Sequence, residues 1–265
     1  MINRHVKILD AITQRQKIEV SALAELLNVS KVTIRKDLAE LEELGVLRRE
    51  HGFAVAGPTD DIGRRMAYKY ETKRRIAQAA ARSVIDGETV LIESGSNCAF
   101  LAEELANNKR DVTIITNSSF IAHHIRHAPH IKIILLGGDY QTEAQVTVGP
   151  IVLKCAEEFF TDKLFIGADG FTEKFGFTGR DHIRAETVQG LAKQSRQVIV
   201  LTDSDKFSHQ GVVRLVRTED VSAVYTDDRI PPEVEAFLLQ KQILVHKAPS
   251  ETQDEPFNRT ISSTS

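Results

Sequence analysis

The segment from Ser30 to Leu38 places cations and hydroxyls on one side of a short helix whose other side is apolar. Ile34, Leu38 and Leu41 recur at intervals of four and three residues, which turns one helical face toward a core. Arg, Lys and Thr side chains at the start of such a helix can hydrogen-bond to base edges and phosphates. The residues that we predict to contact DNA there are Ser30, Lys31, Thr33, Arg35 and Lys36.

An amphipathic helical unit with merely solvated charges would show a similar pattern. Residues 1–57 hold nine Lys and Arg against eight Asp and Glu, a net charge of only +1, so bulk charge does not separate the two interpretations. The arrangement of the charges does, because Glu40, Glu42, Glu43 and Glu50 lie away from the proposed contact end. We therefore favour DNA contact over a helical protein-interaction module.

A second group of polar residues has the chemistry to bind a small phosphorylated polyol. Ser94-Gly95-Ser96-Asn97 leads from an apolar run into a helical pattern, where glycine lets the backbone approach closely and free N–H groups face an anion. Lys206 can neutralise a phosphate, and carboxylates and amides can bind sugar hydroxyls. The residues that we predict to bind this effector are Ser94, Gly95, Ser96, Asn97, Thr116, Asn117, Ser118, Gly138, Asp139, Gly167, Asp169 and Lys206.

Two helices and a hairpin are expected to position the first group. Ile8, Leu9 and Ile12, then Leu23, Leu26 and Leu27, supply two further apolar stripes, and a tight corner at 28–30 completes a helix-turn-helix. After Gly45 ends the third helix, residues 46–50 and 54–56 alternate around His51-Gly52-Phe53 like two short strands. This hairpin predicts a winged helix, with Arg48, Arg49 and His51 as further DNA contacts.

Apolar runs that alternate with helical patterns are expected to position the second group. The predicted strands are 89–92, 112–115, 131–136, 163–166, 197–201 and 223–225, and the predicted helices are 97–106, 118–126, 151–160, 183–193 and 232–241. This alternation is typical of a Rossmann-like α/β domain on a largely parallel sheet. The polar tails after the strands then share one sheet edge, where such folds bind ligands. If they only cap helices and make turns, the same residue types would be expected.

The composition changes between these two regions. Residues 63–75 hold six cations and one anion. Two interpretations stay open: a basic patch beside DNA phosphates, or the solvated face of a helix that continues through 76–81. We predict a DNA-binding domain over 1–57, a basic linker over 58–75, an α/β sensing domain over 76–248 and a disordered tail over 249–265.

The whole chain has 265 residues, 42% of them hydrophobic, and a formal net charge of −3. We find no signal-peptide pattern and no apolar run near the roughly 20 residues of a membrane span, so we expect a cytoplasmic protein without membrane contact. Cys98 and Cys155 have no metal-ligand spacing. We expect reduced thiols, no metal and no cofactor.

Several of these motifs together resemble the DeoR family of bacterial transcription regulators. They are Arg4, Ile8 and Ile12, then Ser30-x-x-Thr33-Ile34-Arg35-Lys36-Asp37-Leu38, then Gly45-Val46-Leu47-Arg48-Arg49-Glu50-His51-Gly52. The segments 93–96, 116–118, 136–138, 167–170 and 203–207 resemble the sensor of that family, which is similar to ribose-5-phosphate isomerase and responds to phosphorylated sugars. The sequence departs from the family at Phe53, where a second glycine is usual, at Asn97-Cys98 and at Val188-Gln189.

The resemblance implies a sequence-specific DNA-binding regulator, a repressor of a carbohydrate-utilisation operon, whose partners are double-stranded operator DNA and a phosphorylated sugar. Because one recognition helix reads about half of a two-fold operator, we expect a homo-oligomer, either dimer or tetramer. Two alternatives stay open. One is a sugar-phosphate isomerase-like enzyme with an accessory DNA-binding domain, and the other is a constitutive DNA-binding or scaffolding protein without an effector.

Overall fold

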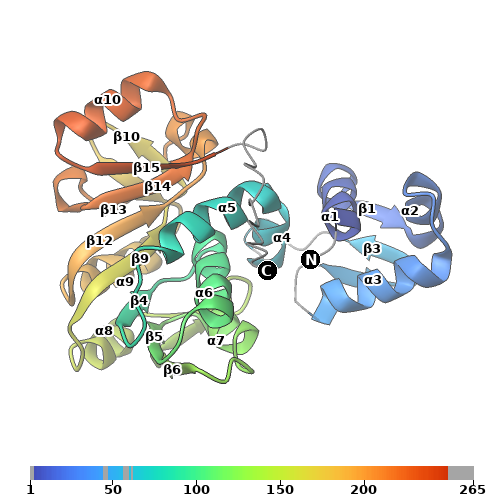
Figure 1. Ribbon diagram of the computed structural model, residues 1–265, viewed down its shortest axis with the longest axis horizontal. Helices are drawn as coiled ribbons and strands as arrows, with labels where there is room; N and C mark the ends of the chain where they lie inside the picture. The colour runs from blue at the N-terminus through green and yellow to red at the C-terminus, as the bar shows by residue number, and fades with distance from the viewer. Residues whose placement is uncertain (1–2, 44–46, 56–59, 61, 250–265) are drawn as a thin grey trace, which may run out of the picture.

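The computed structural model describes residues 3–43, 47–55, 60 and 62–249, and Figure 1 shows two groups of elements with helix α4 at the side of the second group that faces the first. The N-terminal group contains α1 (Asn3–Arg15), β1 (Lys17–Glu19), α2 (Val20–Leu26), α3 (Lys31–Glu43), β2 (Arg48–Glu50) and β3 (Phe53–Val55). The predicted stop at Gly45, the strand ends at Val46 and Ala56, the break at residues 57–59 and 61, and the tail from 250 lie outside the described residues.

The N-terminal group is the predicted winged helix-turn-helix. Apolar residues of α1, α2 and α3 form its core, and Ile8, Leu23, Ile34, Leu38 and Leu41 have no exposed surface. Asn28 makes the corner before α3 with a φ of 52°, a left-handed conformation that asparagine tolerates better than most residues. Leu26, which the apolar pattern assigned to the core, is 51% exposed.

The wing is a three-stranded antiparallel sheet in the order β1-β3-β2. Glu50 pairs with Phe53, so only His51 and Gly52 form the turn, with φ of 39° and 87°. Two positive φ angles are what a tight two-residue hairpin of this kind requires. Phe53 is therefore the first strand residue after the turn, and a second glycine is not needed there. Strand β1 was not predicted, because three residues are too few to show alternation.

A seven-stranded sheet in the order β15-β14-β12-β9-β4-β5-β6 forms the second group, and every neighbouring pair is parallel. Its strands are β4 (Thr89–Ile92), β5 (Val112–Thr116), β6 (Ile131–Leu135), β9 (Thr161–Gly167), β12 (Ser195–Leu201), β14 (Ala223–Asp227) and β15 (Leu244–Ala248). Six of these were predicted. The edge strand β15 was not, because most of its residues face solvent and interrupt the apolar run.

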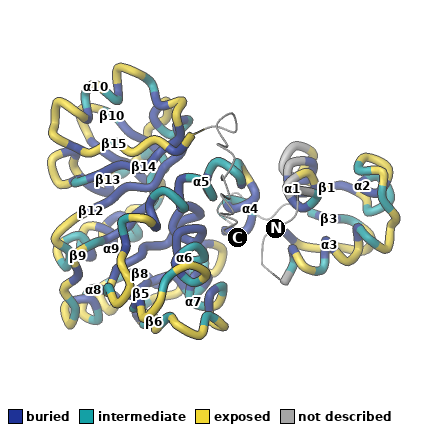
Figure 2. The backbone as a smooth tube through the Cα atoms, viewed as in Figure 1, coloured by how far each residue is buried: buried dark blue, intermediate teal, exposed yellow. Residues whose placement is uncertain are grey.

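Helices cover both faces of this sheet, which is why its strands are almost continuously apolar. They are α5 (Tyr70–Ala81), α6 (Ser96–Asn108) and α7 (Ser119–His124) on one face, and α8 (Pro150–Ala156), α9 (His182–Ala192) and α10 (Pro232–Gln240) on the other. Within β4, Val90 and Ile92 pack on the first face and Leu91 on the second. Figure 2 shows the central strands buried and the outer helix turns exposed.

Smaller features complete the second group, among them the 3-10 helices η1 (Ser204–Ser208) and η2 (Thr218–Asp220). Strands β7 (Asp139–Gln141) and β8 (Val146–Val148) form a hairpin, and β10 (Gly170–Thr172), β11 (Gly176–Gly179) and β13 (Val213–Val216) form a small antiparallel sheet. Helix α4 (Ile62–Ala67) precedes α5. In the described part of the chain, no helix combines the length and the apolar character needed to cross a membrane.

Candidate functional site

Helix α3 begins with a side-chain cap that fixes its first turn. The backbone N–H of Thr33 donates to Ser30 Oγ at 3.1 Å, and the two hydroxyl oxygens lie 2.9 Å apart. Such caps satisfy backbone donors that the helix itself leaves unpaired. Both hydroxyls therefore already have partners before any DNA is bound, whereas Lys31, Val32, Arg35 and Lys36 project into solvent.

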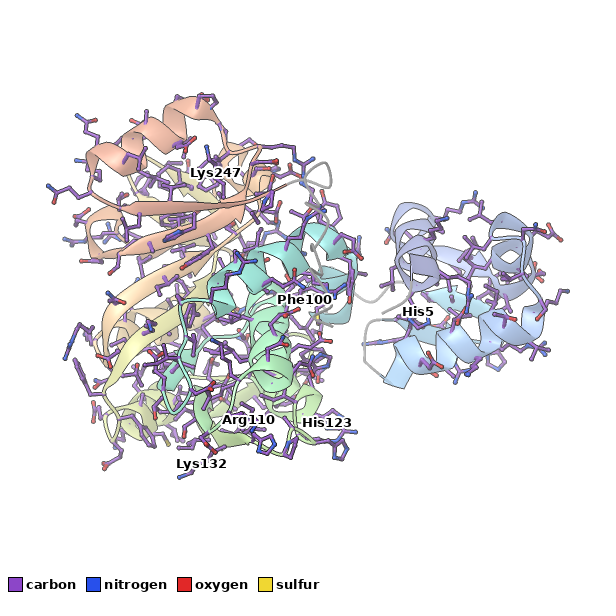
Figure 3. All side chains as sticks on the ribbon, viewed as in Figure 1. His5, Phe100, Arg110, His123, Lys132 and Lys247 are labelled. Atoms are coloured by element: carbon purple, nitrogen blue, oxygen red, sulfur yellow. The ribbon has the colours of Figure 1, made fainter. Side chains whose placement is uncertain are left out.

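An ion-pair network ties α1 to α3. Arg4 Nη2 donates to Asp37 Oδ1 at 2.8 Å, and His5 Nε2 lies 3.3 Å from the same oxygen (Figure 3 labels His5). Hydrogen bonding from Arg4 holds the pKa of the buried Asp37 carboxyl below its usual value. His5, Asp37 and Glu40 have ligand atoms within 4.8 Å of one another, but the Arg4 guanidinium already occupies Asp37. The cluster fits an internal ion pair better than a metal site.

The three predicted wing residues differ in their surroundings. Arg49 donates from Nε to Glu42 Oε2 at 2.6 Å and from its backbone N–H to Glu42 Oε1 at 3.0 Å, so it ties the wing to α3. This hydrogen bonding lowers the pKa of Glu42. Arg48 is exposed on β2, and His51 is exposed at the wing tip.

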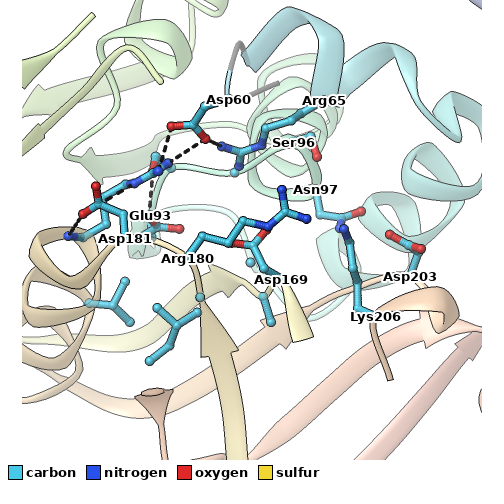
Figure 4. A pocket seen from close by; sticks show the side chains of 18 of the residues that line it. Asp60, Arg65, Glu93, Ser96, Asn97, Asp169, Arg180, Asp181, Asp203 and Lys206 are labelled. Carbon is cyan, nitrogen blue, oxygen red and sulfur yellow. Dashed lines mark hydrogen bonds and ion pairs between the residues drawn. The ribbon is translucent and has the colours of Figure 1, made fainter. Parts of the chain in front are cut away.

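A pocket of about 320 Å³ lies at the carboxyl ends of the adjacent strands β4, β9 and β12 (Figure 4). Parallel α/β sheets bind ligands at this edge. The predicted effector residues that line it are Ser94, Gly95, Ser96, Asn97, Gly167, Asp169 and Lys206. These three strand tails are thus brought together as expected from a parallel sheet.

The tails of β5 and β6 contribute to a different feature, the β7–β8 hairpin. Asn117 Nδ2 donates to the Thr147 carbonyl at 2.9 Å, and Ser118 Oγ caps α7 by accepting from the Ile121 N–H. A Cβ on Gly138 would lie 2.4 Å from Val152, so only glycine fits there. The predicted residues that do not line the pocket are Thr116, Asn117, Ser118, Gly138 and Asp139.

Sequence reasoning missed one whole wall of the pocket. This wall comes from the segment that enters the second group, including α4 and the start of α5, and it consists of Asp60, Arg64, Arg65, Tyr68 and Lys73. Neither interpretation of the basic run at 63–75 anticipated this placement. The excess of cations was the available signal, since a charge cluster next to a predicted phosphate site can serve that site. A further missed set, Arg180, Asp181 and Arg184, follows β11.

Ion pairs hold this wall in place. Arg184 donates to both oxygens of Asp60, at 2.7 and 3.2 Å, and Arg65 Nη1 lies 3.6 Å from Asp60 Oδ1. Lys69 Nζ lies 3.4 Å from the fully buried Asp203 and also pairs with Asp205. The segment that enters the second group is therefore anchored to the pocket at both of its ends.

Two buried groups in the pocket have strongly altered proton affinities. Burial raises the pKa of Glu93 to about 7, although Ser94 Oγ donates to its Oε1 at 2.6 Å. Burial also lowers the pKa of Lys73 to about 7, while its Nζ donates to the Tyr68 carbonyl at 2.7 Å and to that of Arg65. Both groups lose much of their charge near neutral pH because desolvation disfavours the ionised form.

Other pocket groups have no partner in the described part of the chain. The side chains of Arg180 and Lys206 make no ion pair or hydrogen bond there, and Figure 4 shows both reaching into the pocket. Asn97 Oδ1 and Asp203 Oδ2 are buried and likewise unpaired. The pocket therefore offers two cations and two buried oxygen atoms that a polar ligand can contact.

Comparison with known proteins gives the family. The model of the DeoR C terminal sensor domain matches residues 68–228, and that of the DeoR-like helix-turn-helix domain matches residues 4–57. The chain belongs to the DeoR family. The resemblance inferred from the sequence motifs is therefore confirmed.

Relatives of this DeoR-family chain are transcriptional regulators and repressors by name. The HTH-type transcriptional regulator GolR of Listeria innocua is 31% identical over 231 residues, which are 86% of this chain and 91% of the relative. The glycerol-3-phosphate regulon repressor of Escherichia coli is 29% identical over 244 residues, 91% of this chain and 96% of the relative. Among solved structures, ribose 5 phosphate isomerase A from Neisseria gonorrhoeae matches with 16% identity and a TM-score of 0.39, over 51% of this chain and 52% of that one. A likeness this distant concerns the fold alone.

The departures from the DeoR motifs have structural counterparts. Asn97 lines the pocket and donates from Nδ2 to the Leu201 carbonyl at 3.2 Å, so it links the β4 loop to β12. Cys98 is buried behind that loop, and burial raises the pKa of its thiol. Val188 lines the pocket in place of a charge, while the neighbouring Arg184 and Arg180 supply cations.

Proposed function

We propose that this DeoR-family protein is a repressor of a carbohydrate-utilisation operon and that a phosphorylated sugar in the pocket controls its operator binding. The observation that carries the proposal is a set of pocket groups that have no partner among the described residues, two cations and two buried oxygens. A phosphorylated polyol matches this set, because it offers a dianion for Arg180 and Lys206 and hydroxyls for Asn97 and Asp203. The similarity to a glycerol-3-phosphate regulon repressor supports the same ligand class.

In this proposal, the phosphate of the effector binds at the N-terminus of α6. This helix has 13 residues, and Gly95 precedes it with Ser96 as its first residue. Unpaired N–H groups at a helix start attract anions, and Lys206 adds a positive charge from β12's side of the pocket. A volume of about 320 Å³ is at the small end of ligand sites, which favours a single small sugar phosphate.

On the DNA side, α3 enters the major groove with Lys31, Arg35 and Lys36, and the wing adds Arg48 and His51. Ser30 and Thr33 support this contact by capping α3, and Arg49 supports it by tying the wing to Glu42. Because each chain presents one recognition helix, a two-fold operator requires a homo-oligomer, either a dimer or a tetramer.

The wall formed by residues 60–73 supplies the coupling between the two sites. It follows the DNA-binding domain in the sequence. Its Asp60 carboxylate accepts two hydrogen bonds from the Arg184 guanidinium, as a ligand phosphate would. An incoming anion competes with Asp60 for Arg184, which loosens the start of α4 and changes how the DNA-binding domain is held. Coupling of 1–3 kcal/mol suffices for an effect of about 5- to 150-fold on operator affinity.

The test is binding of the full-length protein to its own upstream promoter DNA, at fixed salt, with and without a panel of sugar phosphates. We expect sequence-specific binding whose affinity one sugar phosphate changes. Specific binding that no sugar phosphate of the panel changes would contradict the assigned ligand class. Absence of specific binding would contradict the proposed function as a DNA-binding regulator.

A parallel assay addresses the enzyme alternative. Isomerisation of a sugar phosphate requires a base within reach of a carbon-bound proton, and Glu93 is a pocket carboxyl whose pKa is near neutral. We expect no turnover of pentose or hexose phosphates, because the relatives are regulators. Measurable turnover that is lost in Glu93→Gln would favour the enzyme instead.

A further inference from the structure

Val32 occupies an unusual place for an apolar side chain. It is the second residue of α3, and 74% of its surface is exposed. Among the large hydrophobic residues in the described ranges, only Val212 is more exposed, at 84%. Ile34, Leu38 and Leu41 of the same helix have no exposed surface, so Val32 takes no part in the core that the helix forms.

Nothing in the local structure favours valine at this position. A β-branched side chain loses rotamer freedom in a helix, so most other residues would suit an exposed helical site better. The helix start is already stabilised by Ser30 and Thr33, whose hydroxyls are engaged with each other and with the backbone. Val32 therefore serves neither the fold nor the cap.

The position of Val32 is the one from which a recognition helix reads bases. The N-terminal residues of such a helix point at base edges. Val32 lies three residues before Arg35 and four before Lys36, so the three side chains share one helical face. Both cations are exposed. The face thus combines one apolar group with two donors.

We propose that Val32 is a specificity-determining residue that contacts the 5-methyl group of a thymine in the operator. That methyl group is the apolar feature that base pairs present in the major groove, and it is recognised by apolar side chains. Three residues advance about 4.5 Å along a helix, against about 3.4 Å between base pairs. The thymine therefore lies within roughly one or two base pairs of the base that Arg35 contacts. The inference rests on the proposed DNA binding.

The experiment removes the methyl group from the DNA and the apolar group from the protein in turn. Sites are first selected from a random DNA pool with the full-length protein. Each thymine of the selected half-site is then replaced by deoxyuridine, which lacks only the methyl group, and dissociation constants are measured for the natural protein, Val32→Ala and Val32→Thr. Val212→Ala is the matched control, because it truncates another highly exposed valine, which lies outside the DNA-binding domain.

We expect one thymine per half-site at which deoxyuridine weakens binding of the natural protein about fourfold, the effect of losing one buried methyl group. Val32→Ala should bind the thymine-containing site more weakly by a similar factor, and replacing that thymine by deoxyuridine should not weaken its binding further. Val32→Thr should keep part of the sensitivity to deoxyuridine, and Val212→Ala should keep all of it. Sequence-specific binding with equal deoxyuridine effects in natural protein and Val32→Ala would overturn the assignment alone. Failure to select any sequence would overturn the proposed function together with it.

Discussion

At the scale of single residues, what distinguishes the pocket cations is whether each already has a counterion. Arg184 pairs with Asp60, and Lys69 pairs with Asp203 and Asp205. Arg180 and Lys206 have no such partner in the described part of the chain. A ligand anion gains most from cations that do not have to release a carboxylate first. The unpaired cations should therefore dominate effector affinity.

Lys206→Ala and Arg180→Ala are expected to abolish the effector response without changing operator affinity in the absence of effector. Each removes a charge-assisted hydrogen bond to phosphate, which is typically worth about 1.5–3 kcal/mol, or roughly 10- to 150-fold in affinity. Effector titration by calorimetry measures the loss. Lys132→Ala, on the edge strand β6 and exposed (Figure 3), is the control that should behave like the natural protein. A normal response in Lys206→Ala would place the phosphate elsewhere.

The buried carboxyl of Glu93 should make stability depend on pH. Its pKa is raised from 4.5 to about 7, so the folded protein holds this proton more tightly than the unfolded chain does. Its contribution is fully present below pH 4.5 and is lost as the pH rises through about 7, a change on the order of 3 kcal/mol. Glu93→Gln, which stays neutral, should remove this decline. Denaturant unfolding at several pH values compares the two, and parallel curves would show that Glu93 does not titrate in this range.

At the scale of elements, α1 and α3 depend on one buried carboxylate. Asp37 accepts from Arg4 and lies beside His5, so it joins the first helix to the recognition helix. The apolar periodicity predicts that the two helices pack together, but it does not reveal which polar groups fix their relative position. Loss of this ion pair should therefore affect both the stability of the domain and its DNA affinity.

Asp37→Asn is expected to lower the stability of the DNA-binding domain, because it removes the carboxylate that pairs with Arg4 and His5. The pKa of Asp37 is lowered, so its contribution exists above the usual carboxyl range and is lost as the pH falls through the lowered value. Thermal unfolding followed by circular dichroism measures the change. The double variant Arg4→Met with Asp37→Asn should recover part of it, and an unchanged melting temperature in Asp37→Asn would refute the role of the pair.

At the scale of the whole molecule, the segment between the two groups of elements belongs to the pocket wall. Asp60 binds Arg184, and Tyr68 and Lys69 bind Asp205 from the other end of the segment. In the proposed mechanism, binding in the pocket and placement of the DNA-binding domain therefore act on the same residues, which is what linkage between two sites requires.

Asp60→Asn is expected to shift operator affinity, without any effector, in the same direction as the effector shifts it in the natural protein. It should also tighten effector binding, because Arg184 no longer has to release a carboxylate. Both changes are measured by operator and effector titrations and should fall within the 5- to 150-fold range of ordinary coupling. Asp162→Asn, which breaks an exposed pair with Arg196, is the control. Unchanged operator affinity together with an unchanged effector response would exclude Asp60 as the coupling residue.

The sequence by itself determined the local elements and the family. Periodicity of apolar residues predicted the three N-terminal helices and six of the seven strands of the large sheet, because buried faces impose a repeat on nearby residues. It also predicted that polar tails such as 94–97 and Lys206 meet at one edge, since parallel strands end on the same side. The short strand β1 and the solvent-facing edge strand β15 were not predicted, because neither buries enough side chains to produce a repeat.

Only the tertiary structure decided which of those tails share a pocket and what closes it. The order β12-β9-β4 brings three tails together, while the tails of β5 and β6 support the β7–β8 hairpin. The order of strands along the chain does not give their order in the sheet, so the sequence could not predict which tails line the pocket and which support the hairpin. The pairing of Asp60 with Arg184 joins residues 124 positions apart. Contacts of that kind leave no periodic trace, because they depend on where two distant segments are placed by the core.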